Sequence, residues 1–133
     1  MTELDIAKQI ATEAHAGQTR RDGTPYIRHP ERVAARCKTE QEKAVAWLHD
    51  VIEDCPGWTE MKLIESGISK SVALSVFRLS KQTDQSEKMY LISVKGNPLA
   101  KTVKIQDMLD NLSDQPTEKQ IVRYARSLLF LLE

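Results

Sequence analysis

The sequence predicts an all-α fold, a single compact bundle of about seven or eight helices. Three observations lead to this fold class. Apolar residues recur at helical spacing in almost every segment, helix caps and breakers follow one another at short intervals, and the connections between segments are short. A length of 133 residues is enough for one compact domain with a real core.

The first predicted helix covers roughly residues 3–17, where apolar side chains recur every three or four positions and a glycine suits the stop. A polar segment follows. Asp22-Gly23 is a turn signal, and the prolines at positions 25 and 30 favour extended backbone before them. We therefore expect an ordered loop between the first two helices.

The second and third predicted helices follow this loop. Pro30 suits the first helical position, which puts His29 at the cap, and the helix runs to about residue 37 or 38. The third helix covers about residues 41–54, and Pro56-Gly57 ends it.

The second half of the chain predicts further helices from their caps and breakers, with a loop over residues 80–85. The expected segments are a short helix capped by Thr59 and closed by Gly67, one capped by Ser69, one over 87–95 closed by Gly96, one over 98–113 capped by Asn97, and a last one opened by a Thr117-x-x-Gln120 capping box.

The third helix contains the most informative stretch, residues 46–54. It places His49, Asp50, Glu53 and Asp54 within an apolar run, so we expect the segment to be largely buried. On one continuous helix, residues four apart share a face, which puts His49 beside Glu53 and Asp50 beside Asp54. Buried carboxylates are costly unless a positive charge pairs with them, and a divalent metal is a suitable one.

Composition excludes some classes of function. Lys plus Arg equal 19 and Asp plus Glu equal 19, which argues against a binder of nucleic-acid polymers or membrane surfaces. No apolar run approaches membrane-spanning length, and no signal region opens the chain. Cys37 and Cys55 lack a metal-binding or disulfide pattern and predict buried thiols in a reducing compartment. We expect a cytoplasmic protein.

Two further residues join the central stretch as candidate metal ligands. His29 precedes a helix, and Asp107 lies in a later apolar helix. Taken alone, Asp107 is better explained as a solvated acid, and His29 can serve as a simple cap or packing group. With His49 and Asp50 they supply two nitrogens and two carboxylate oxygens, a set that suits Mn²⁺ or Fe²⁺ better than a closed structural zinc site.

The order of these residues resembles the H…HD…D pattern of the HD-domain metal-dependent phosphohydrolases. Three longer motifs cover about residues 11–54 and 100–124. They are AHxGQxRRDGTPYIxHPxxVA from Ala14, AWLHDVIED from Ala46, and VKxxDxxxN from Val103. These motifs resemble the hydrolase domain of the RelA/SpoT family, and within it the small alarmone hydrolases such as the metazoan SpoT homologue.

The resemblance implies one HD-type domain over residues 1–133 and a role for each matching position. The implied Mn²⁺ ligands are His29, His49, Asp50 and Asp107. Glu53 and Asp54 would orient and deprotonate the attacking water. The implied substrate contacts are Arg20 to the guanine, Arg21 where the family usually has a lysine, Asn111 to the ribose, and Tyr124 from the last helix.

The implied reaction is hydrolysis of the 3′-pyrophosphate of the stringent-response alarmones (p)ppGpp, giving GDP or GTP and pyrophosphate. The implied partner is thus a small-molecule nucleotide. Other HD-domain activities stay open, on ppApp, the 2′-phosphate of NADPH or other nucleotides, as does a non-catalytic nucleotide sensor. Ser80 and Gln120 depart from the family's usual residues, and the sequence leaves a homo-oligomer open.

Overall fold

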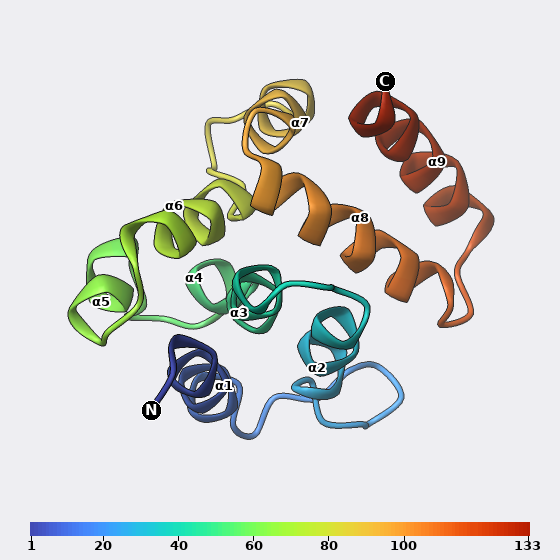
Figure 1. Ribbon diagram of the computed structural model, residues 1–133. Helices are drawn as coiled ribbons and strands as arrows, with labels where there is room; N and C mark the ends of the chain where they lie inside the picture. Colours follow the sequence, from blue (N-terminus) through green and yellow to red (C-terminus); the bar gives the residue numbers. More distant parts are fainter.

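Nine α-helices and no β-strand make up the computed structural model, which describes all 133 residues (Figure 1). The predicted all-α fold is confirmed. The helices are α1 (Glu3–Ala14), α2 (Arg28–Ala35), α3 (Glu40–Leu48), α4 (Val51–Asp54), α5 (Glu60–Glu65), α6 (Lys70–Leu79), α7 (Glu87–Lys95), α8 (Pro98–Leu112) and α9 (Glu118–Leu132).

Helix α3 lies at the centre of the bundle, with α1 and α2 on one side and α6 and α8 on the others (Figure 1). It buries Ala44, Val45, Ala46 and Leu48, which belong to a single core cluster of 25 buried apolar residues. Each fully buried large aliphatic side chain contributes roughly 1.5–3 kcal/mol of transfer free energy. The small alanines let neighbouring helices approach α3 closely, and this brings polar side chains from several helices together at its end.

The predicted caps form in most places. The side-chain oxygens of Thr59, Ser69 and Asn97 each accept a backbone N–H in the first turn of the helix that follows. Thr117 and Gln120 form the predicted capping box. These local bonds satisfy N–H groups that have no partner within the helix.

Three boundaries of α1 and α2 differ from the prediction, one of them the end of α2, which lies at Ala35 and not at residue 37 or 38. Helix α1 ends at Ala14, before Gly17 in its left-handed conformation (φ 82°). Helix α2 begins at Arg28, so His29 lies inside its first turn and is not the cap. The extended backbone expected before Pro30 is not found, because the helix begins two residues before it. Pro30 is tolerated in this first turn because the N–H that proline lacks would have no helical partner there.

The predicted single helix over residues 41–54 is interrupted at His49 and Asp50, which separates α3 from α4 and raises the helix count above the expected number. Asp50 has φ −104° and ψ 0°, outside the helical region. The His49 imidazole donates its Nδ1–H to the Ala46 carbonyl at 2.6 Å, and the His49 N–H also points to it, at 3.4 Å. The Ala46 carbonyl, which would accept the Asp50 N–H in a continuous helix, is therefore already occupied by His49.

Helix α9 is the most loosely held long element. It packs mainly against α8 and α7, and among its residues only Ser127 and Leu131 are buried. Several of its apolar side chains are exposed, including Leu129 at 64% and Leu132 at 65%. None of the helices combines the length and apolar character needed to cross a bilayer. Cys37 and Cys55 are buried free thiols, as predicted.

Candidate active site

Two imidazoles and a carboxylate meet at the end of the central helix. His29 comes from the first turn of α2, whereas His49 and Asp50 form the interruption between α3 and α4. The His29 and His49 rings lie edge to face with centroids 5.2 Å apart. One ligand atom from each of the three residues lies within 4.8 Å of the other two. Three of the four residues that the sequence proposed as metal ligands are thus brought together.

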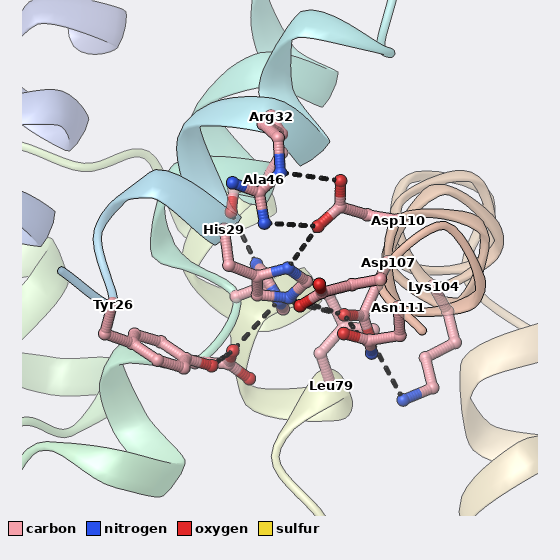
Figure 2. Close-up of polar contacts among 12 residues, drawn as sticks. Tyr26, His29, Arg32, Ala46, Leu79, Lys104, Asp107, Asp110 and Asn111 are labelled. Atoms are coloured by element: carbon pink, nitrogen blue, oxygen red, sulfur yellow. Dashed lines mark hydrogen bonds and ion pairs between the residues drawn. The ribbon is translucent and has the colours of Figure 1, made fainter. Parts of the chain in front are cut away.

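The fourth, Asp107, reaches the same cluster from α8 (Figure 2). Its Oδ1 lies 2.8 Å from Nε2 of His29 and 3.4 Å from Nε2 of His49. On the other side, the Lys104 ammonium donates to its Oδ2 at 3.2 Å, and the Asn111 amide contacts Oδ1 at 3.4 Å. Asp107 is therefore held in place by α8 itself while facing both imidazoles.

The donor set fits a divalent transition metal. Nδ1 of His49 is used by the Ala46 carbonyl, so its Nε2 faces Asp50 at 3.1 Å and Asp107 at 3.4 Å. This Nε2 is buried and makes no hydrogen bond. A buried nitrogen without a partner, aimed between two carboxylates, is explained if a cation occupies the position it faces.

Sequence reasoning missed three residues beside this cluster, two that contact it and one that contacts it through another side chain. Asp110 accepts a hydrogen bond from Nδ1 of His29 at 2.7 Å, and Arg32 donates to both oxygens of Asp110 (Figure 2). The Tyr26 hydroxyl donates to Asp50. The signal for Asp110 was its position three residues after Asp107, which places the two carboxylates on neighbouring parts of one helix face.

The proposed catalytic pair forms a second group with Asp50. Carboxylate oxygens of Asp50, Glu53 and Asp54 lie within 4.8 Å of one another, so Asp50 belongs to both groups. Glu53 Oε1 also accepts the Lys81 N–H at 2.8 Å from the start of the loop after α6. The expected burial of the stretch does not extend to Glu53 and Asp54, which are exposed. The helix interruption turns this end of the stretch toward solvent.

The two carboxylates Asp50 and Asp54 lie in different electrostatic surroundings, and their pKa values shift in opposite directions. Burial disfavours the ionised form of Asp50, but His49 and the Tyr26 hydroxyl outweigh burial and lower its pKa to about 2. Partial burial and the charges of Asp50 and Glu53 raise the pKa of Asp54 to about 6. Excess negative charge beside the imidazoles favours binding of a cation.

A polar cleft of about 600 Å³ adjoins the cluster. All four predicted substrate residues line it, whereas Glu53 and Asp54 do not. Its lining includes Arg20, Arg21, Tyr26, Asn111, Gln120 and Tyr124. Arg20 donates to the Asn111 side chain at 3.2 Å, and Asn111 contacts Asp107, so one chain of contacts joins the cleft to the imidazoles.

A second hollow of about 720 Å³ lies between α7 and α9 and is lined by Leu91, Val122 and Phe130 among others. It is larger than the polar cleft but shares no residue with it or with the imidazole cluster. Its lining surface is mostly apolar and holds one carboxylate, Glu87, but no imidazole and no group of metal-ligating side chains. The polar cleft is therefore the better candidate for substrate.

Comparison with known proteins identifies relatives of this chain. SpoT from Escherichia coli K12, a bifunctional (p)ppGpp synthase/hydrolase, is 46% identical over 82 residues, which are 59% of this chain and 11% of SpoT. A guanosine-3′,5′-bis(diphosphate) 3′-pyrophosphohydrolase from Aquifex aeolicus is 30% identical over 122 residues, 83% of this chain and 17% of the relative. A GTP pyrophosphokinase from Myxococcus xanthus is 30% identical over 150 residues, covering 96% and 20%. No protein-family model matches.

One solved structure shares the fold. It is described as a metazoan ortholog of SpoT that hydrolyzes ppGpp and plays a role in starvation responses. The TM-score is 0.79 at 22% identity, and the match covers 100% of this chain and 86% of the other. The predicted resemblance to RelA/SpoT proteins and the HD-domain fold are confirmed. The chain spans only between 11% and 20% of the length of the three curated relatives described above.

The raised pKa of Asp54 predicts how stability depends on pH in the metal-free protein. Its folded-state pKa of about 6 lies above the ordinary 3.8, so ionised Asp54 destabilises the fold, and the effect grows from about pH 4 to pH 6. Asp54→Asn should therefore raise the melting temperature at pH 7.5, with a smaller gain near pH 4. Thermal unfolding in a chelator measures this. Asp84→Asn in the exposed loop is the control, and equal gains for both variants at pH 7.5 would contradict the assignment.

Proposed function

We propose that this chain is a metal-dependent phosphohydrolase that removes the 3′-pyrophosphate of (p)ppGpp, giving GDP or GTP and pyrophosphate. One observation supports this most strongly. A cluster of two imidazoles and two carboxylates lies next to acids suited to activate water, and it adjoins a polar cleft with two arginines. The curated relatives named for this reaction support the same assignment.

In this proposal a Mn²⁺ ion is held by His29, His49, Asp50 and Asp107. When bound, such an ion lowers the pKa of a water ligand and withdraws charge from a phosphoryl oxygen. The protein keeps the ligands in place through their other contacts. The Ala46 carbonyl orients His49, the Tyr26 hydroxyl orients Asp50, and Lys104 orients Asp107.

Glu53 and Asp54 are proposed to position the attacking water and take its proton. Both lie beside Asp50, and the pKa of Asp54 at about 6 suits a base that works near neutral pH. The water oxygen forms a bond to the phosphorus attached to the ribose 3′-oxygen. The bond from that phosphorus to the 3′-oxygen breaks, and this oxygen takes up a proton to become the ribose 3′-hydroxyl.

The cleft suggests how the nucleotide lies. Asn111 is one helical turn beyond Asp107 and suits the ribose next to the reacting phosphate. Arg20 lies farther out, bonded to Asn111, and suits the base, while Arg21 and Tyr124 complete the wall. A guanidinium can stack on a base or pair with a phosphate.

The remaining predictions belong to this proposal. Residues 1–133 act as one HD-type hydrolase domain, the native cation is Mn²⁺, and the partner is a small nucleotide, not a nucleic-acid polymer or a membrane. The cytoplasmic location stays a prediction.

A substrate panel tests the reaction directly. The purified chain with Mn²⁺ is expected to convert ppGpp to GDP and pppGpp to GTP, with one pyrophosphate per nucleotide. Chromatography of the nucleotides and a pyrophosphate assay read the outcome, with metal content measured on the same sample. Phosphate release from NADPH with ppGpp untouched would assign the alternative phosphatase. Tight ppGpp binding without any product would make the chain a sensor.

Two substitutions should separate metal binding from proton transfer. His49→Ala is expected to lose both bound Mn²⁺ and turnover. Glu53→Gln should keep Mn²⁺ and lower kcat by about 10² to 10⁴, the usual effect of removing an acid–base group. Metal analysis and steady-state kinetics measure both. Glu60→Gln, a half-buried carboxylate bordering the same hollow as Glu53, is the matched control. Full activity in a metal-free His49→Ala protein would reject the site.

Arg20→Ala tests the placement of the nucleotide. Arg20 makes no contact with the proposed metal ligands, so its loss should raise KM for ppGpp and leave kcat within a few-fold. A rise of roughly 10- to 100-fold corresponds to one lost hydrogen bond to a charged group. Arg126→Ala, on the part of α9 that faces away from the polar cleft, is the control. An unchanged KM would remove the proposed base contact.

A further inference from the structure

On the side away from the other proposed metal ligands, His29 is held by an ion pair that the proposed reaction does not use. Nδ1 of His29 lies 2.7 Å from Oδ2 of Asp110. The Arg32 guanidinium contacts both oxygens of this carboxylate, from Nε at 2.9 Å and from a terminal nitrogen at 3.2 Å. Asp110 is 1% exposed, whereas the Arg32 side chain is 46% exposed.

On the side away from the cluster, this geometry calls for a hydrogen on Nδ1 of His29. Arg32 donates to both oxygens of Asp110, so the group is held as a carboxylate that can only accept. The 2.7 Å contact then requires a hydrogen on Nδ1 of His29. Nε2, the other nitrogen, faces Asp107 at 2.8 Å on the cluster side.

We propose that Asp110, oriented by Arg32, is a positioning residue that keeps hydrogen on Nδ1 of His29 and so presents Nε2 as the metal-binding nitrogen. The inference rests on the proposed metal site. A carboxylate on the distal N–H fixes the ring orientation of a metal-ligating histidine and makes its other nitrogen more basic. Neither Asp110 nor Arg32 touches the reacting atoms.

A purely structural role explains the arrangement less well. Asp110 joins α8 to α2, but helix packing does not require a buried charge. Replacing a buried ion pair by apolar residues is often neutral or stabilising. Three groups contact this carboxylate: His29 and Arg32 of α2, and the C-cap residue Arg36, whose Nε lies 3.9 Å from Oδ1. Its contact with the imidazole is the one that leads to the site.

The test compares three variants of the full chain, Asp110→Asn, Arg32→Ala and Arg28→Ala. Arg28 is the matched control, since it lies one turn before Arg32 on α2 and pairs with the exposed Glu31 at 3.1 Å. Calorimetric titration with MnCl₂ measures metal affinity. Nitrogen-15 NMR of the imidazoles in the metal-free protein reads the Nδ1–H of His29, and with three histidines in the chain the spectrum is readily assigned.

We expect Asp110→Asn to weaken Mn²⁺ binding by about 10- to 100-fold, the usual effect of removing such a carboxylate. Arg32→Ala should show a smaller loss and Arg28→Ala none. In the metal-free protein, the His29 Nδ1–H signal should move upfield and exchange faster with water in Asp110→Asn.

A folded Asp110→Asn protein with unchanged Mn²⁺ affinity and an unchanged Nδ1–H signal would overturn the inference. If this variant does not fold, Arg32→Ala decides, because its partly exposed side chain can be removed without opening the core. Weaker Mn²⁺ binding by it then supports the role, and unchanged binding rejects it. A wild-type chain that binds no Mn²⁺ would refute the proposed metal site, and the Nδ1–H signal would still decide the ring hydrogen.

Discussion

Charge compensation around the buried carboxylates is the constraint on which this structure depends. Asp107 and Asp110 are both buried on α8, and each is matched by groups from other parts of the fold. Asp110 is paired with Arg32, while Asp107 has Lys104 on one side and the imidazoles on the other. Because an unpaired buried charge is costly, α2 must lie where His29 and Arg32 can reach these carboxylates.

The interruption between α3 and α4 is the second requirement for the site. A continuous helix would place His49 and Asp50 on adjacent strips and direct them to different surroundings. The imidazole takes the Ala46 carbonyl instead, and the backbone at Asp50 leaves the helical region. Asp50 thereby joins the imidazoles on one side and the acids of α4 on the other. A local break in secondary structure thus connects the proposed ligand residues with the proposed proton-accepting residues.

Sequence reasoning predicts helices well where caps and breakers define them, as at Thr59, Ser69 and Asn97. It also finds His29 and Asp107, because their residue types fit a pattern shared with His49 and Asp50. It does not find the interruption, since apolar periodicity continues through it and the competing imidazole bond depends on a side-chain rotamer. It misses Asp110 for a related reason: an acid on an amphipathic helix is usually solvated, and only the arrival of α2 buries this one.

The loose attachment of α9 affects how the polar cleft can open. One wall, formed by α8 and the loop before α2, is tied to the core by ion pairs and hydrogen bonds. The opposite wall includes Gln120 and Tyr124 of α9, which buries few of its side chains. Elements with few buried contacts open at low free energy. Under the proposed function, a bulky nucleotide would enter and leave by displacing this outer helix, while the side chains on the opposite wall keep their arrangement.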